Sequence, residues 1–297
     1  MNKRLFRNTV VFIVLVILSG WIGVLVDSIL SEQTRGDSPG MGIWLVLPLT
    51  AVIAITIFSK SNWSDIGFKP NFKGNIKWYF IAVLIFPVVT AIVLIIGATT
   101  NWIDLSAFDF RPFILVFSST LLLNFIRDIF DGAPLYGYLT SQLVKLNLSD
   151  WKIYLTVGSV WGMWHIPYYL VFLSETDMQE VLPVSRTMFS IVSVITMVCW
   201  AAMFIELYRI TNSIWPGVIL HMVEDSLINP LVISGFISIA AGKEILISPI
   251  TGIITSILYL AVGLGIGAYR KQKNQITVIN GKIISNPLPE RSKNKNQ

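Results

Sequence analysis

Repeated apolar runs, each about twenty residues long, constrain this chain more than any other feature of its sequence, because a helix of that length crosses a hydrocarbon core of about 30 Å. Within such a core every backbone polar group has to be satisfied by the segment itself. We therefore expect an all-α, polytopic integral membrane protein with about eight transmembrane helices. The expected spans are residues 10–30, 41–59, 78–99, 113–143, 153–173, 187–208, a span that opens at residues 214–217, and residues 246–269.

Composition agrees with this architecture and leaves no room for a separate soluble domain. Of the 297 residues, 54% are hydrophobic and only 13% are charged. We expect one transmembrane domain over residues 1–273 and a polar cytoplasmic tail over residues 274–297. Residues 229–244 fit either an extension of the seventh span or a segment at the membrane interface. The single cysteine, Cys199, excludes a disulfide within the chain.

The distribution of basic residues predicts how the chain is oriented. If both termini lie on one side, the loops of that side hold nearly all lysines and arginines. The opposite loops hold only Arg35, Arg111, Arg186 and Lys243. This asymmetry predicts a multi-pass protein of the cell membrane with both termini in the cytoplasm. The net charge of +5 then reflects topology and contact with membrane lipid, and nucleic acid is not an expected partner.

Polar residues inside the apolar runs mark the expected functional region. Residues 127–139 combine two carboxylates, two glycines and Pro134 in an otherwise apolar span. Pro167 and Pro216 accompany two further polar clusters. Irregular backbone at membrane depth is tolerated where it is buried in protein or lines a wet cavity. We therefore expect the three clusters to face one polar cavity, which opens toward the cytoplasmic half.

The only two histidines, His165 and His221, both lie inside predicted spans. Ionisable groups at this depth are candidates for function. His221 and Asp225 are four residues apart and share a helix face, with Glu224 nearly beside them. This spacing suits a metal site, a carboxylate that orients an imidazole, or a buried pair that reduces the cost of desolvation. Spacing alone does not separate the three interpretations.

Three motifs in order carry a resemblance to a known family. The motifs are residues 131–139, then Trp161 with His165 and Pro167, then residues 212–216 followed by His221 and Asp225. In order and spacing they resemble the CPBP family, the CAAX-processing and bacteriocin-processing intramembrane proteases, also called Abi. The resemblance covers about residues 113–230 and implies an eight-helix fold and a peptidase site.

The resemblance also implies roles for individual residues. Asp131 would be the base that activates water, and His165 and His221 would polarise the water or stabilise the oxyanion. Asp225 would orient His221. The chain departs from the family in its first motif, where Gly132 stands at the second glutamate and Tyr136 at the arginine.

Two functional interpretations remain open from the sequence. The first is an intramembrane endopeptidase that acts on a membrane-associated peptide or protein tail. The second is a catalytically degenerate, non-catalytic scaffold of the same fold that serves bacteriocin immunity or the cell envelope. For the cofactor, the sequence is compatible with two alternatives, namely no cofactor or a divalent metal. A metal such as zinc would be held by His165, His221, Asp131 and Asp225, which are suitable in ligand type.

Overall fold

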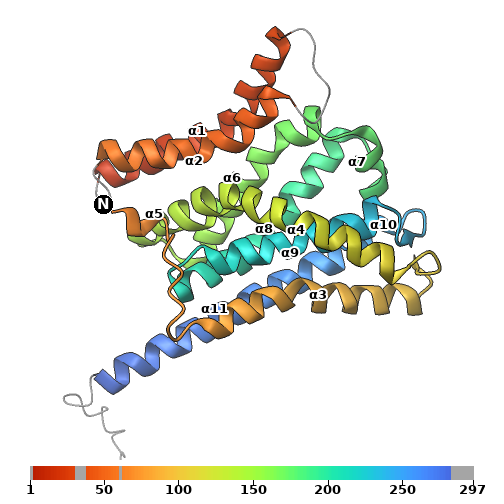
Figure 1. Cartoon of the computed structure of the whole chain (residues 1–297). Coiled ribbons are helices and arrows are strands. Elements are labelled where there is room, and N and C mark those ends of the chain that lie inside the picture. Colours follow the sequence, from red (N-terminus) through yellow and green to blue (C-terminus); the bar gives the residue numbers. More distant parts are fainter. Residues whose placement is uncertain (1–2, 31–37, 60–61, 282–297) are drawn as a thin grey trace, which may run out of the picture.

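The computed structural model describes residues 3–30, 38–59 and 62–281, and helices dominate it (Figure 1). The helices are α1 (Lys3–Ile29), α2 (Pro39–Ser59), α3 (Ile76–Thr99), α4 (Phe110–Gly132), α5 (Thr140–Lys145), α6 (Asp150–Pro167), α7 (Glu175–Val181), α8 (Arg186–Thr211), α9 (Trp215–Ile233), α10 (Glu244–Ile247) and α11 (Ile253–Gly281). A short 3₁₀ turn, η1 (Trp63–Asp65), precedes α3. The prediction of an all-α polytopic membrane protein is confirmed.

Six helical segments of the described chain are long and apolar enough to cross a membrane. They are α1, α2, α3, the continuous segment Phe110–Lys145, α8 and α11. The two remaining predicted spans correspond to α6 and α9, which have 18 and 19 residues. These two helices carry the histidines and are mostly buried among the others. The most polar spans are therefore the inner ones, as expected where lipid surrounds the bundle.

Two predicted span starts differ from the observed ones by seven residues each. Helix α1 begins at Lys3 rather than at residue 10, because its basic N-terminal residues are compatible with a helix that continues beyond the apolar core. Helix α11 begins at Ile253 rather than at residue 246, because Pro249 interrupts the helix after α10. At its other end α11 continues to Gly281. The predicted tail is therefore helical over residues 274–281, and its remainder lies outside the described residues.

The backbone is irregular beside two of the three prolines of the polar clusters. A π-helical segment, η2 (Ala133–Leu139), follows α4 and contains Pro134. A second one, η3 (Tyr168–Phe172), follows α6 directly after Pro167. Pro216 instead lies in the first turn of α9, where its missing N–H costs nothing. The widened turns therefore lie where the sequence predicts broken backbone, next to the candidate site residues.

The segment 229–244, for which the sequence left two alternatives, combines a helix end with a short strand. Helix α9 continues to Ile233, and β2 (Ser238–Ile239) then pairs antiparallel with β1 (Ile103–Asp104). Ile103 lies opposite Ile239 in this pair. The two strands join the α3–α4 loop to the α9–α10 loop.

Two tryptophans fix α2 against α6. The Trp44 Nε1 donates to the Trp164 carbonyl at 2.9 Å, and the Trp164 Nε1 donates to the Trp44 carbonyl at 3.1 Å. The two rings stack with centroids 4.7 Å apart. Because each indole satisfies its one donor on the other helix, the pair fixes the position of α2 beside the cavity.

The connector between α2 and α3 closes one end of the bundle. Its Gly67 carbonyl accepts from the Ile214 backbone at 3.0 Å, and its Asp65 carbonyl accepts from the Tyr208 hydroxyl at 2.6 Å. The Trp215 indole donates to the Phe68 carbonyl at 2.6 Å. The connector therefore packs across the C-terminal end of α8 and the N-terminal end of α9. In Figure 1 α5 and the C-terminal end of α11 lie at the left, and α7 and α10 lie at the right.

A buried ion-pair cluster joins α6, α8 and α11 at the end that holds the termini. Glu206, which is fully buried, accepts from the Tyr154 hydroxyl at 2.6 Å and from Arg270 at 2.5 and 3.1 Å. Arg209 bridges Glu206 at 3.1 Å and Asp150 at 2.8 Å. The cluster thereby ties three helices with opposite charges at close range.

Replacing Glu206 with alanine is expected to lower the free energy of unfolding by about 3 kcal/mol, because it leaves the partly buried guanidinium groups of Arg209 and Arg270 without their shared carboxylate. Thermal unfolding of the purified protein in detergent measures the loss. The matched control is Glu180→Ala on the exposed surface of α7, which should leave the melting temperature unchanged. Equal stability of the two variants would show that the cluster does not hold the helices together.

Candidate active site

Polar side chains from three helices meet in the interior of the bundle. Helix α4 contributes Asp128 and Asp131, α6 contributes His165, and α9 contributes His221 with Glu224. All five side chains are at most 9% exposed. Each helix presents them because the residues recur at helical spacing on one face. The predicted convergence of the three clusters is therefore what the structure shows.

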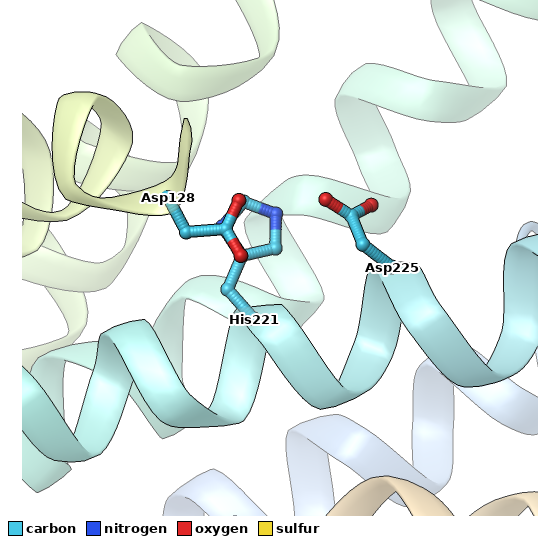
Figure 2. Close-up of side chains that lie close together, drawn as sticks. All are labelled: Asp128, His221 and Asp225. Carbon is cyan, nitrogen blue, oxygen red and sulfur yellow. The ribbon is translucent and has the colours of Figure 1, made fainter. Parts of the chain in front are cut away.

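His221 lies among three carboxylates. Its Nδ1 is 3.7 Å from the Asp128 Oδ1 and 3.9 Å from the Asp131 Oδ2, and its Nε2 is 3.5 Å from the Glu224 Oε2. Figure 2 shows Asp128 of α4 beside the ring of His221, with Asp225 one turn further along α9. Both ring nitrogens of His221 therefore face carboxylates, and its Nδ1 has no hydrogen-bond partner among the described residues.

Arg127 supplies the positive charge of the site. Its guanidinium forms an ion pair with Asp225, and its Nε lies 3.7 Å from the Asp128 Oδ1. Asp225 also accepts from the Asn229 side chain at 2.8 Å. The expected role of Asp225 was to orient His221, but its closest partners among the described residues are Arg127 and Asn229. The groups closest to His221 are Asp128, Asp131 and Glu224.

His165 is held in one orientation by its own helix and by aromatic rings. Its Nδ1 lies 3.0 Å from the Trp161 carbonyl, which only accepts, so Nδ1 carries the proton. Nε2 is then the nitrogen that remains for chemistry. The ring packs edge-on against Trp164 with centroids 4.7 Å apart and stacks on Tyr169 at 5.7 Å. These contacts fix both the tautomer and the ring plane.

All four predicted site residues line one cavity of about 190 Å³. Asp131, His165, His221 and Asp225 share it with Arg127 and Glu224. Its lining also includes Val181 of α7 and Ile250, which follows α10. The opening toward the cytoplasmic half stays a prediction.

Tyr136 fills the position that the first motif would otherwise leave open. Its ring is 1% exposed and lies between two glycines. A Cβ atom at Gly132 would be 2.6 Å from the Tyr136 hydroxyl oxygen, and one at Gly217 would be 2.6 Å from the ring. Tyr136 also packs against Phe204 with centroids 5.0 Å apart. The two departures from the CPBP motif thus fit each other, because the ring of Tyr136 occupies the space that a side chain at position 132 would need.

A metal would find suitable donor types in part of the site. Atoms of Asp128, His221 and Asp225 lie within 4.8 Å of one another, and one imidazole with two carboxylates suits zinc. This trio differs from the predicted set, since Asp128 takes part while Asp131 and His165 do not. Arg127 already pairs with Asp225, so a cation would compete with the guanidinium for that carboxylate. The Asp128 oxygens have no hydrogen-bond partner among the described residues, which leaves them available to a ligand.

Three site residues were not among the four predicted from the sequence. Arg127 and Asp131 are four residues apart, Asp128 and Asp131 are three apart, and Glu224 follows His221 by three. Helical spacing from the predicted residues is therefore the signal that identifies them. Asp128 and Glu224 were noticeable as carboxylates near the motifs, but neither belongs to the CPBP pattern.

Comparison with known proteins agrees with this geometry. Residues 112–227 match the family model described as "Type II CAAX prenyl endopeptidase Rce1-like". Over these residues the match supports a fold of the CAAX-protease type, and the apolar helices agree with a membrane protein. The match confirms the predicted resemblance to the CPBP family, and it spans α4 to α9, the helices that supply the site. No curated protein and no solved structure matches the chain significantly.

The fit between Tyr136 and Gly132 predicts a directional coupling. Gly132→Ala should lower the free energy of unfolding by about 1–3 kcal/mol, because the new methyl group would overlap the buried phenol. The double variant Gly132→Ala with Tyr136→Ala should lose less stability than the two single changes added together. Chemical or thermal unfolding of the four proteins of this cycle gives the coupling energy.

Gly265→Ala is the control for this cycle. Its Cβ would have no neighbour within 4 Å, so the change should be neutral or should stabilise α11 by up to about 1 kcal/mol. Additive losses in the cycle would contradict a direct contact between the Tyr136 ring and position 132.

Proposed function

We propose that the protein is an intramembrane endopeptidase that hydrolyses a peptide bond in a membrane-associated peptide or protein tail. The observation that carries this proposal is the placement of a carboxylate, Asp131, within 3.9 Å of His221 in a cavity that His165 also lines. A base and two imidazoles in a partly closed, low-dielectric site are the parts that hydrolysis of an amide requires.

The proposed reaction uses these groups in two steps. The Asp131 carboxylate accepts a proton from water while the water oxygen attacks the carbonyl carbon of the scissile peptide bond. The N–H of the neutral His221 ring donates a hydrogen bond to the tetrahedral oxyanion, and the free Nε2 of His165 accepts a hydrogen bond from the attacking water. The C–N bond then breaks as the proton on Asp131 passes to the leaving nitrogen, which yields a carboxyl group and an amine.

Arg127 and Asp128 support the proposal because they supply charges that the altered first motif lacks. The CPBP motif has a second glutamate and an arginine where this chain has Gly132 and Tyr136. Asp128 is a second carboxylate on α4, and Arg127 is a guanidinium one turn before Asp131. Both approach the site from the same continuous segment, Phe110–Lys145, as the residues they would replace. The net charge of the site is thereby kept close to that of the CPBP pattern.

A second candidate function is a non-catalytic scaffold of the same fold, in bacteriocin immunity or in maintenance of the cell envelope. The observation that favours it is the packing of Tyr136 between Gly132 and Gly217, which closes the place of the missing motif residues with an aromatic ring. Under this function the histidines would only stabilise the bundle.

Location, partners and metal belong to the same proposal. We place the protein in the cell membrane with both termini cytoplasmic, since the basic loops lie at the end that holds the termini. Its partners are membrane lipid and a peptide or membrane-protein substrate. A divalent metal such as zinc, when bound, would be held by Asp128, His221 and Asp225 and would supply Lewis acid chemistry.

The peptidase proposal predicts a loss of hydrolysis on replacing the base. Asp131→Asn should reduce cleavage of a prenylated CAAX peptide or of membrane-extracted peptides by at least about a hundredfold, because the amide cannot accept the proton of water. His165→Ala and His221→Ala should reduce it similarly. Mass spectrometry of peptides incubated with the purified protein in lipid nanodiscs measures the products.

Asp177→Asn, on α7 and away from the cavity lining, is the matched control and should cleave like the unaltered protein. The scaffold would be favoured if neither the unaltered protein nor any variant cleaves a peptide, while His165→Ala still supports the protein's function in cells. Cleavage that survives Asp131→Asn would reject the assignment of the base.

The metal part of the proposal predicts zinc in the purified protein at about one equivalent per chain, as expected of a specific site. Elemental analysis after dialysis measures this content directly. Asp128→Asn should lower it, because the change removes one of three ligands. Retention of the same zinc content in Asp128→Asn would exclude the Asp128, His221 and Asp225 site.

A further inference from the structure

A second pocket lies apart from the candidate active site, where the connector before α3 meets the last residue of α8, Thr211. Its volume is about 560 Å³. The connector supplies most of its lining, including Lys69, Asn71, Phe72, Lys73 and Asn75. None of its lining residues also lines the cavity that holds the two histidines. The pocket is therefore a separate feature, which neither candidate function uses.

Hydrogen bonds fix the wall of this pocket. The Asn71 Nδ2 donates to the backbone carbonyls of Thr211 at 3.2 Å and of Asn212 at 2.9 Å. The Asn75 Nδ2 donates to the Asn71 carbonyl at 2.9 Å. Asn71 has a φ of 49°, in the left-handed region that asparagine tolerates better than most residues. The connector is thus tied to the end of α8, and the pocket between them has a defined shape.

The pocket carries two positive charges without an anionic partner among the described residues. Lys69 and Lys73 are both exposed, and neither forms an ion pair within the described ranges. None of the residues that line the pocket is acidic. The nearest carboxylate in the connector, Asp65, is already paired with Lys145. Two ammonium groups are therefore available to an anionic ligand.

Apolar side chains beside the pocket place it at the level of lipid headgroups. Helices α3 and α8, one of which begins and the other ends at the pocket, are both long and apolar enough to cross a membrane. Phe72, Ile76 and Phe80 are each more than half exposed. Lysines next to exposed apolar side chains at the end of a membrane helix suit the headgroup region. This placement holds whichever side of the membrane the pocket faces.

We infer that this pocket binds the phosphate group of an acidic phospholipid, with the ammonium groups of Lys69 and Lys73 as its partners. Phosphate oxygens accept charge-assisted hydrogen bonds from ammonium groups. The source of the phosphate is a lipid, because Phe72 and Ile76 offer apolar contact to acyl chains and offer nothing to a free phosphate ion. The inference goes beyond the proposed function and does not depend on cleavage of a peptide.

A bound lipid would also hold the connector against the bundle. The connector contacts η2, since a Cβ atom at Gly137 would lie 2.5 Å from the Ile66 carbonyl oxygen. Its Gly67 carbonyl accepts from the Ile214 backbone at 3.0 Å. A ligand that binds only the folded protein raises the melting temperature by mass action. Acidic phospholipid should therefore stabilise the protein through this pocket.

Native mass spectrometry of the whole protein in a neutral detergent tests the inference, with phosphatidylglycerol as the probe. Titration gives the dissociation constant of the bound lipid. Lys69→Gln and Lys73→Gln should each weaken binding about fivefold, and the double variant more than about tenfold, because each change removes one ammonium group. The double variant should also lose most of the rise in melting temperature that phosphatidylglycerol gives the unaltered protein.

Two controls separate the pocket from general charge and from misfolding. Lys152→Gln removes an exposed lysine of α6 that does not line the pocket, and it should bind the lipid like the unaltered protein. The double variant with arginine at 69 and 73 keeps both charges and should also keep binding. Unchanged affinity in the double glutamine variant would overturn the inference. An equal loss in Lys152→Gln would overturn it too, because net charge alone would then account for binding.

Inorganic phosphate distinguishes the two sources of the ligand. Added in excess over phosphatidylglycerol, it should leave the lipid bound, because it lacks the acyl chains that contact the apolar side chains. Displacement of the lipid by inorganic phosphate would overturn the lipid source and assign the pocket to a free anion. Neither result bears on peptide cleavage, so failure of this inference and failure of the proposed function are read from different measurements.

Discussion

Ionisable side chains inside an apolar bundle require polar partners, and the arrangement of the central helices follows from this requirement. Asp128, Asp131 and Glu224 surround His221, and Arg127 pairs with Asp225. Each of these groups alone would carry a large desolvation cost. Together they bring α4 and α9 into contact along their length, and the more apolar helices around them face lipid. The polar site is therefore also the reason that α6 and α9 are the inner helices.

Much of the fold could be predicted because it depends on local sequence. Apolar length locates the spans, and the prolines at 134 and 167 locate the irregular turns. The motif spacing brings Asp131, His165 and His221 to one cavity. Arg127 could be found from its helical spacing to Asp131, but only once α4 is known to be helical through that region. The pairing of Arg127 with Asp225 could not be predicted from the sequence, because the approach of α4 to α9 is a long-range contact.

The packing around the first motif could not be predicted for a related reason. In the CPBP pattern, charged side chains occupy the space around positions 132 and 136. The structure fills this space with one phenol ring between two glycines on different helices, and the connector before α3 covers the result. Gly217 lies 81 residues after Tyr136 (217 − 136), so no local pattern indicates that they meet.

The Gly132, Tyr136 and Gly217 packing also limits the evolutionary paths open to this protein. A glutamate that arose at 132 would meet the ring of Tyr136, and an arginine that arose at 136 would be a buried charge with no carboxylate at 132. Each single step toward the CPBP motif therefore passes through a less stable protein, although both steps together give a matched pair. Such sign epistasis separates the sequence of this chain from the CPBP motif. The charges that α4 brings to the site come instead from Arg127, Asp128 and Asp131.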